Sequence, residues 1–369
     1  MFNYLTFDQK SVGYWDHIKN SPTVNAIYSS WKKFNWPDTY FLLNLNWPSI
    51  TLIDSIPKDV EKIILSFQIE AVDIYWLKAL ALRFKKSQII VVHEGAFYPS
   101  QWWPDNLFFV NWITWDEQLR RIASTHGRQD FVENSKFKIT SLCSRTSQYK
   151  FYVTGYMLKN YNNGDSLISY HNRVDKKSDI NHLRTGIPAI DDLVEYMTDQ
   201  TSVRIDDTTH AQRNNDLDNT NWNYRAHVDS VFCLTNEGYH YSYSIVDHQE
   251  IIHPGPPLSE KTFKPLLAGQ AIIMVGQANS LSLLSKLGFD FDYGIDNSYD
   301  SELQDLQRIQ MIFKVIDTVM GMSLNDLKKV TREKCAYNSH WAVSNDLKKI
   351  TAELNENSLT VIRKKLFAN

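Results

Sequence analysis

The sequence predicts an α/β fold with two domains, each built on a parallel sheet. Short apolar runs typical of buried strands alternate with segments whose apolar residues recur at helical spacing. The chain has 369 residues, which is enough for two domains of ordinary size. Apolar residues make up 43% of it, enough for two sizeable hydrophobic cores. Two α/β domains are therefore expected.

The first domain is expected over residues 1–140. Residues 73–85 carry apolar side chains at helical spacing, including Leu77 and Leu80, and predict a helix. Four apolar runs predict buried strands at 40–45, 62–67, 88–94 and 107–112. No glycine-rich dinucleotide fingerprint and no phosphate-binding loop follows any of these runs, which argues against a nicotinamide dehydrogenase and a P-loop kinase.

The second domain is expected over residues 141–330, with C-terminal helices over 331–369. A strand near 137–143 and a helix over about 147–160 open this half of the chain. Residues 161–228 are polar and predict long loops with few elements, one of them a helix near 189–197.

The most informative segment is residues 257–276, which predicts a loop, a short helix, a glycine stop and a buried strand. Gly269 suits the C-terminal cap of the helix, and Ala271–Val275 is a short apolar run of the buried type. The pair Glu260–Lys261 lies where the helix begins. The unpaired N–H groups and the dipole of that helix end, together with the charge of Lys261, predict a site for an anion.

A second polar signal precedes this segment. The run 229–237 is an apolar strand that ends in a polar turn carrying Glu237. In open α/β sheets, ligands lie at the carboxyl ends of strands, so Glu237 and the Glu260–Lys261 pair are expected to face one crevice. The alternative is that the pair is an ordinary solvated surface charge.

The order of these motifs resembles the donor-binding domain of GT-B glycosyltransferases, above all the α1,3-fucosyltransferases and the exostosin-like enzymes. The pattern is Phe-x-Leu-x-x-Glu, a gap of about twenty residues, and Ser-Glu-Lys-x-x-Lys-x-Leu-x-Ala-Gly-x-x-x-Ile-x-x-Gly, and the resemblance covers residues 229–300. It implies a GT-B architecture, in which two Rossmann-like domains face a cleft. It also implies a nucleotide-diphosphate sugar, such as a UDP-sugar, as co-substrate. It further implies that Glu260 lies near the ribose, Lys261 near the diphosphate and Glu237 in the donor pocket.

Such enzymes often neutralise the diphosphate with an upstream arginine as well. Arg145, which follows the strand-like run 137–143, is the candidate here. Lysine and helix-end contacts suffice for that charge, so no metal and no tightly bound cofactor are expected. The alternative is the Asp290-x-Asp292 pair, a pattern by which GT-A enzymes hold a divalent metal.

The catalytic base is sought at a strand end of the first domain. Glu94 follows an apolar strand and precedes Gly95, which permits a sharp turn; His93 is the alternative base. Either residue could instead only cap the next segment. A carboxylate base would imply inversion at the anomeric carbon.

Composition limits the setting of this activity. The three scattered cysteines form no disulfide or zinc pattern, and the N-terminus does not resemble a signal peptide, so a cytoplasmic enzyme is expected. The Asn-, Lys-, Ile- and Tyr-rich composition suggests a phage, in which case the setting is the host cytoplasm.

Two acceptor classes remain open, and the first is slightly favoured: hydroxymethylcytosine in phage DNA, which would make the protein a DNA-modification enzyme, and a glycan. The net charge of −3 gives no general attraction to DNA, and no run of residues is apolar enough for an integral membrane association. A non-catalytic carbohydrate- or nucleotide-binding protein with the same fold is the alternative from another class.

Overall fold

The structure is a computed structural model, and it comprises two compact units. It describes residues 3–6, 39–44, 58–67, 74–93, 104–111, 113, 119–120, 122–124, 128–143, 148–170, 183–200, 227–237, 243–246, 249–252 and 258–367. Unit 1 comprises Met1–Thr114, Ile245–Pro257 and Ile350–Asn369, and unit 2 comprises Trp115–Ser244 and Leu258–Lys349.

Unit 1 contains a parallel sheet whose strands are neighbours in the order in which they occur along the chain. The order is β1 (Asn3–Thr6), β2 (Thr39–Asn44), β3 (Lys62–Phe67), β4 (Gln88–His93) and β5 (Leu107–Asn111). The helix α4 (Ile74–Arg83) connects β3 to β4, and Leu77 and Leu80 on its predicted apolar face are buried. Strand order does not reverse among the described strands of this sheet.

Unit 2 contains a four-stranded parallel sheet of a different topology. Its strands are β6 (Phe137–Cys143), β7 (Ser166–Tyr170), β8 (Ser230–Asn236) and β11 (Ala271–Val275), in the spatial order β11-β8-β6-β7. The chain thus adds β7 on one side of β6 and then returns to add β8 on the other side. All residues of β8 are buried, as expected for a central strand covered on both faces. All residues of β11 are buried as well, although it ends the described sheet, because α10, α12 and α13 pack against it.

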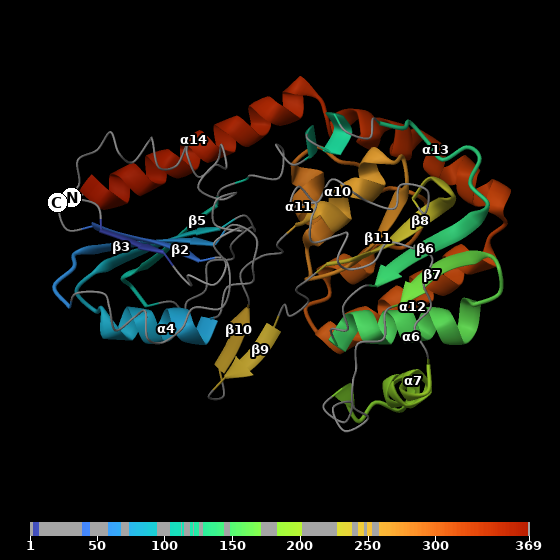
Figure 1. The fold of residues 1–369 in the computed structure, drawn as a ribbon, viewed down its shortest axis with the longest axis horizontal. Helices are drawn as coiled ribbons and strands as arrows, with labels where there is room; N and C mark the ends of the chain where they lie inside the picture. Colours follow the sequence, from blue (N-terminus) through green and yellow to red (C-terminus); the bar gives the residue numbers. More distant parts are fainter. Residues whose placement is uncertain are drawn as a thin grey trace. The chain divides into compact units, whose positions relative to one another are not determined.

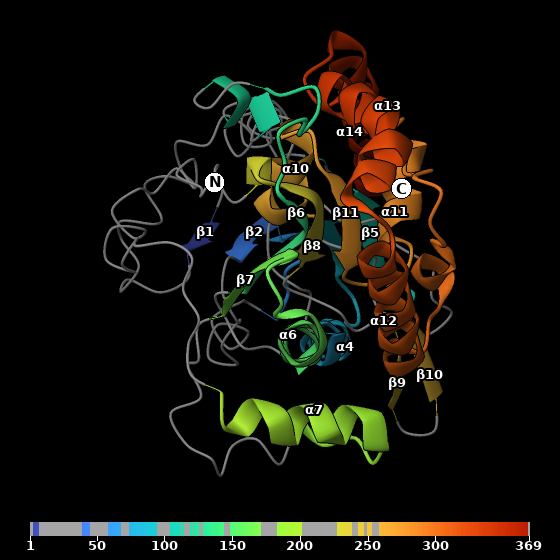
Figure 2. The same ribbon diagram turned by 90° about the vertical axis from the view of Figure 1, so that its right-hand side faces the viewer.

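Helices cover both faces of this second sheet (Figure 1). One face packs against α10 (Glu260–Leu267) and α13 (Leu324–Trp341), and the other against α6 (Gln148–Tyr161) and α12 (Asp305–Gly321). The helix α7 (Pro188–Thr198) packs on α6 and forms a further layer outside the sheet (Figure 2). The remaining elements are α11 (Ser280–Lys286), η3 (Ser298–Ser301), α14 (Asn345–Phe367) and the two-stranded ladder of β9 (Tyr243–Val246) and β10 (Gln249–Ile252).

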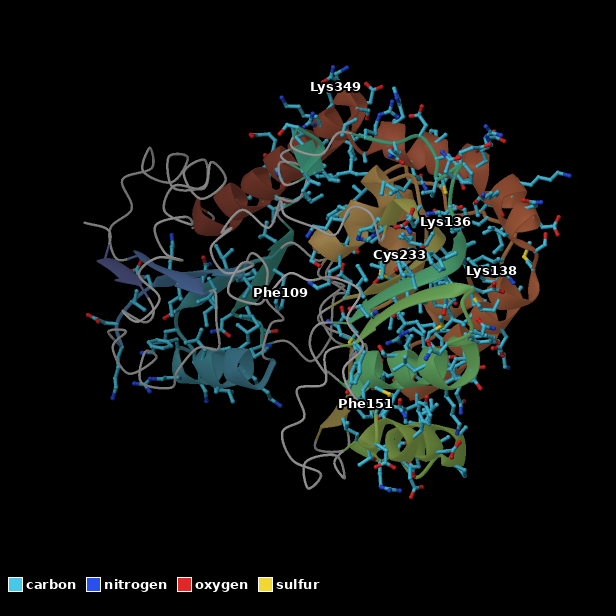
Figure 3. All side chains as sticks on the ribbon, turned by 45° about the vertical axis from the view of Figure 1, so that its right-hand side comes forward. Phe109, Lys136, Lys138, Phe151, Cys233 and Lys349 are labelled. Carbon is cyan, nitrogen blue, oxygen red and sulfur yellow. The ribbon has the colours of Figure 1, made fainter. Side chains whose placement is uncertain are left out.

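The predicted α/β class with two parallel sheets is confirmed, whereas the boundaries differ from those predicted. A boundary at 140 would divide β6, which belongs wholly to unit 2, and α13 packs on the second sheet although part of it was placed in a separate C-terminal segment. Residues 161–228 were predicted as long loops with few elements, of which only the helix near 189–197 was located; the segment Ser166–Tyr170 is another element, the edge strand β7. The interior of unit 2 includes Phe151 and Cys233 (Figure 3). The three cysteines are buried, and no disulfide joins them.

Candidate active site

The strand order of unit 2 places a topological switch between β6 and β8. The connection after β6 leads to β7 on one side, whereas the connection after β8 leads to β11 on the other side. The loops that follow β6 and β8 therefore diverge. In doubly wound sheets, ligands bind in the crevice that this divergence leaves at the carboxyl ends of the strands. The predicted residues Arg145 and Glu237 follow these two strands in the sequence.

Glu237 joins the end of β8 to the start of α10. Its backbone N–H donates to the carbonyl of Val275 at 3.0 Å, which extends the pairing of β8 with β11. Its carboxylate accepts hydrogen bonds from the Ser259 N–H (3.1 Å), from the Ser259 hydroxyl (2.6 Å) and from the Thr262 hydroxyl. The side chain is only 2% exposed. Two motifs about twenty residues apart are therefore held together by one buried carboxylate.

Ser259 is the N-cap of α10. Its side chain accepts a hydrogen bond from the Lys261 N–H at 3.3 Å, and its carbonyl accepts one from the Thr262 N–H at 3.0 Å. These bonds satisfy N–H groups that would otherwise be unpaired at the helix start. The negative charge of Glu237 lies at the same end and offsets part of the positive helix dipole. An anion at this position would consequently depend on the charge of a side chain more than on the helix end.

Lys261 supplies such a charge. Its side chain is partly exposed, and its ammonium group donates to the Ser259 hydroxyl at 3.3 Å, so the cation lies beside the N-cap. Glu260 begins α10, and its side chain lies outside the described residues. The structure thus brings Glu237 and Lys261 together around one residue, Ser259, that sequence reasoning did not single out. A polar residue immediately before a Glu-Lys pair was the available signal for it.

Gly269 ends α10 and has a left-handed backbone (φ 71°), as predicted. A side chain on it would also meet backbone atoms of Gln129 and Phe131 at 2.8 Å. Both the backbone conformation and the lack of space therefore require glycine at this position.

The loop after β11 lies next to Glu237, and a hydrogen bond from a buried arginine holds it in position. A Cβ atom on Gly276 would lie 3.5 Å from the Cβ of Glu237. Arg308 of α12 is 2% exposed, and its Nε donates to the Gly276 carbonyl at 3.1 Å, while its other nitrogens donate to the Glu302 carbonyl and to Asp305. Neither the burial nor the partner of Arg308 is visible in the sequence.

Asp300 fixes the other end of the same loop. Its carboxylate accepts hydrogen bonds from the N–H groups of Leu281 and Ser282, both at 2.9 Å, and so caps α11, the helix that precedes it in the sequence. Burial raises the pKa of Asp300, although these hydrogen bonds and the charge of Arg308 oppose the change. Asn279, just before α11, has a left-handed backbone (φ 65°), which costs free energy in a residue other than glycine.

Two further polar side chains end strands at this edge and were missed by sequence reasoning. Tyr170 ends β7 beside Cys143, and Asn236 ends β8 beside Val275. The Tyr170 hydroxyl and the Asn236 Oδ1 are buried and have no hydrogen-bond partner within the described part of the chain. Burial raises the pKa of Tyr170 to about 12, so its hydroxyl stays protonated at neutral pH. Leaving such groups unsatisfied costs about 1–3 kcal/mol each, and a bound ligand would recover part of this.

The remaining predicted site residues are Glu94, His93 and Arg145. Glu94 and Arg145 lie outside the described residues, as does the side chain of His93. The backbone of His93 ends β4, where it pairs with Phe67 and Asn111. Their assignment as bases or as a phosphate ligand therefore stays a prediction.

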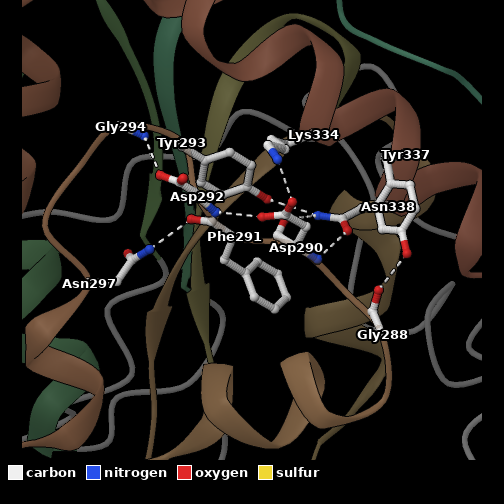
Figure 4. Close-up of polar contacts among 10 residues, drawn as sticks. All are labelled: Gly288, Asp290, Phe291, Asp292, Tyr293, Gly294, Asn297, Lys334, Tyr337 and Asn338. Atoms are coloured by element: carbon white, nitrogen blue, oxygen red, sulfur yellow. Dashed lines mark hydrogen bonds and ion pairs between the residues drawn. The ribbon is translucent and has the colours of Figure 1, made fainter.

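The Asp290-x-Asp292 pair belongs to a loop that is tied to α13 (Figure 4). Asp290 forms an ion pair with Lys334, and its carboxylate also accepts the Asp292 N–H at 3.0 Å. Burial alone would raise the pKa of Asp290, but the hydrogen bonds and the charge of Lys334 hold it below its usual value. Among the residues that the structure describes, no three side chains of the metal-binding kind gather at one point. Asp290 thus has a structural partner in Lys334.

Comparisons with known proteins give no family assignment. No family model matches the chain, and no curated protein matches its sequence. Among solved structures, a UDP-forming α,α-trehalose-phosphate synthase from Burkholderia xenovorans is similar at 8% identity and a TM-score of 0.38, over 94% of this chain and 79% of that chain. An α,α-trehalose 6-phosphate synthase from Burkholderia multivorans is similar at 9% identity and a TM-score of 0.40, over 97% of this chain and 78% of that chain. At these TM-scores neither activity is transferred to this chain.

In the described residues, no helix combines the length and the apolar character needed to cross a membrane.

Proposed function

We propose that this protein is a glycosyltransferase that moves a sugar from a nucleotide-diphosphate sugar, such as a UDP-sugar, to an acceptor hydroxyl. The observation that supports the proposal most is the junction of β8 and α10 at Glu237 and Ser259. It brings together, at the carboxyl edge of the second sheet, the two halves of the motif that resembles a GT-B donor site.

In this proposal the donor diphosphate is neutralised by Lys261 and Arg145, and Glu260 accepts hydrogen bonds from the ribose. Glu237 acts in the donor pocket by holding the start of α10 in position, because its carboxylate is already engaged by Ser259 and Thr262. Removing a cation that contacts the leaving diphosphate should cost a few kcal/mol in the transition state.

The acceptor proton is assigned to Glu94, with His93 as the alternative. Direct attack of the acceptor hydroxyl on the anomeric carbon forms the new glycosidic bond and releases the nucleoside diphosphate. With a carboxylate base, this single displacement inverts the anomeric configuration. Positively charged side chains at the diphosphate make a metal unnecessary in this proposal.

Binding of the donor nucleotide tests the proposal first. A ligand that binds only the folded protein raises its melting temperature, so the protein is heated with UDP, GDP, CDP or dTDP. At least one should stabilise the wild type, and Lys261→Ala should lose that effect. The matched control is Lys264→Ala, one turn further along α10, which should keep it. If no nucleoside diphosphate raises the melting temperature, the proposal fails.

The acceptor is identified by a second experiment. Hydroxymethylated DNA, slightly favoured as the acceptor, and a panel of glycans are each incubated with the protein and the donor found above. Mass spectrometry then shows which of them gains the mass of a sugar. Unmodified DNA of the same sequence is the control for the DNA arm.

A further inference from the structure

Unit 2 has an open cavity of about 760 Å³ between α11, the loop that follows it and α13. The cavity shares no residue with the proposed donor site at Glu237, Ser259 and Lys261. The polar side chains that line it include Ser282, Ser285, Asp290, Asp292, Asn297 and Tyr337.

The wall of this cavity is held in place by α13 (Figure 4). The buried Asn338 accepts a hydrogen bond from the Asp290 N–H at 2.8 Å and donates to the Asp290 carbonyl at 2.6 Å. Asn297 donates to the Phe291 carbonyl at 2.7 Å, and Tyr337 donates to the Gly288 carbonyl at 2.9 Å. A ligand would therefore meet a preformed surface and would have little of the loop to order.

The charge of the cavity excludes anions. Three carboxylates line it, those of Asp290, Asp292 and Asp300, whereas no lysine, arginine or histidine occurs among its described lining residues. Lys334 forms an ion pair with Asp290 and also attracts Asp292, and Arg308 attracts Asp300, but neither cation is among the residues that line the cavity. A phosphate, a nucleotide or a nucleic-acid backbone would be repelled here, which leaves uncharged and cationic ligands.

Each of the three carboxylates already accepts hydrogen bonds from the protein. Asp290 is paired with Lys334, both oxygens of Asp300 accept backbone N–H groups, and Asp292 accepts the Gly294 N–H at 3.4 Å. Their demand for a further positive charge is reduced, yet each carboxylate oxygen has two lone pairs and can accept a hydroxyl. Serine hydroxyls and the amide of Asn297 complete a lining that can both donate and accept.

An aromatic ring stands at the same cavity. Tyr337 is 44% exposed although its ring is large and apolar, and the ring is held in offset stacking with Trp341 (centroids 6.0 Å apart, interplanar angle 12°). An exposed ring fixed in this way offers a flat apolar face beside hydrogen-bonding groups. A pyranose has the matching chemistry, since it combines an apolar C–H face with a rim of hydroxyls.

We propose that this cavity binds an uncharged saccharide, with the Tyr337 ring against one face of a sugar and with Ser282, Ser285 and Asp292 bonded to its hydroxyls. This binding site is separate from sugar transfer, and its test is independent of whether the protein is an enzyme.

The test is calorimetric titration of the full chain with four neutral trisaccharides: maltotriose, cellotriose, mannotriose and triacetylchitotriose. At least one should bind, and Tyr337→Ala should weaken that binding about tenfold, which corresponds to about 1.4 kcal/mol. Tyr337→Phe keeps the ring and should bind within about threefold of the wild type, a difference well under 1 kcal/mol. Val330→Ala, an exposed position on the same helix outside the cavity, is the matched control and should bind as the wild type does.

Separate titrations use putrescine and inorganic phosphate. Asp292→Asn removes a charge and keeps an acceptor oxygen. It should weaken the binding of a neutral sugar only severalfold, because a hydrogen bond to a neutral oxygen is weaker than one to a carboxylate, whereas the binding of a cation would fall far more. The proposal is overturned if no trisaccharide binds, if Tyr337→Ala binds as tightly as the wild type, or if putrescine or phosphate competes for the site. Thermal denaturation of each variant confirms that it is folded.

Discussion

The carboxylate of Glu237 accepts hydrogen bonds from both the backbone N–H and the hydroxyl of Ser259, at 3.1 and 2.6 Å. This contact joins the carboxyl end of a central strand to the first turn of the neighbouring helix. It is short in space and spans 22 positions in the sequence. Whatever binds at this edge of the sheet meets a helix start whose position depends on one buried carboxylate.

The first prediction concerns the strength of this contact. Glu237→Gln puts an amide NH₂ where one carboxylate oxygen accepts, so a buried donor of Ser259 or Thr262 loses its partner. We expect the free energy of unfolding to fall by about 1–3 kcal/mol, measured by urea denaturation. In a double-mutant cycle with Ser259→Ala, the two losses should fall short of additivity by about 1 kcal/mol. Glu195→Gln, on the exposed face of α7, should leave stability unchanged; simple additivity in the cycle would contradict the contact.

The second prediction is a pH dependence that arises at His227. This side chain is 5% exposed, and its Nδ1 lies 2.7 Å from the Oε1 of Gln270. Burial lowers its pKa from 6.5 to about 4, with a smaller contribution from Lys264 and an opposing one from the bond to Gln270. The pKa of His227 is lower in the folded protein than in the unfolded chain. The folded protein is therefore most stable above pH 6.5, and this stability is lost as the pH falls toward 4.

This loss should reach about 3 kcal/mol over that range, since each unit of pKa shift corresponds to about 1.4 kcal/mol. Urea denaturation at several pH values measures it. His227→Gln does not titrate and should show a smaller decline, whereas the exposed His340→Gln should follow the wild type. Equal declines in the wild type and in His227→Gln would assign the effect to other groups.

The third prediction uses two glycines with similar backbones. Gly288 has φ 94° and Gly164 has φ 90°. A side chain on Gly288 would lie 2.5 Å from the ring of Trp341, whereas nothing lies within 4 Å of the same position on Gly164. Gly164→Ala should cost about 1 kcal/mol, because only the left-handed backbone opposes it. Gly288→Ala should cost about 1–3 kcal/mol more, because the ring must also move. Melting temperatures of the two variants compare them directly, and equal changes would mean that Trp341 yields freely.

The fourth prediction separates binding from chemistry at Glu94. If Glu94 removes the acceptor proton, Glu94→Gln should keep donor binding and lose about 10²–10⁴-fold in the rate of transfer. Rates are followed by release of the nucleoside diphosphate, and donor binding by the melting-temperature shift described above. His93→Gln provides the comparison: a greater loss in that variant would transfer the role of base to His93.

Short apolar runs and the glycine that ends a helix were predicted best from the sequence. Ala271–Val275 and the run that ends at Glu237 have the largely apolar pattern of buried parallel strands, and both strands are wholly buried. Gly269 was recognised because a helix that must stop before a strand calls for a left-handed residue. The residues within each segment determine such strands and helix ends, so one sequence is enough to predict them.

Features that depend on distant contacts were predicted poorly. The edge strand Ser166–Tyr170 has only five residues, with serine at two of them, and its role comes from pairing with β6. Asp300 caps α11, a helix that begins about twenty residues before it in the sequence. The buried cation of Arg308 looks, in sequence, like any charge on an exposed helix. In each case the deciding partner lies more than a few positions away, so no local pattern reports it.

The side chain of Asn355 brackets the backbone of Ile113, accepting its N–H at 2.7 Å and donating to its carbonyl at 2.8 Å. Both residues belong to unit 1, although the whole of unit 2 is encoded between them. During synthesis on the ribosome, the strands of unit 1 emerge early, and more than half of the protein is made before Asn355 can form these hydrogen bonds. Unit 1 should thus reach its full stability only after translation has passed unit 2, and early release of a shortened chain would leave it a substrate for chaperones and proteases.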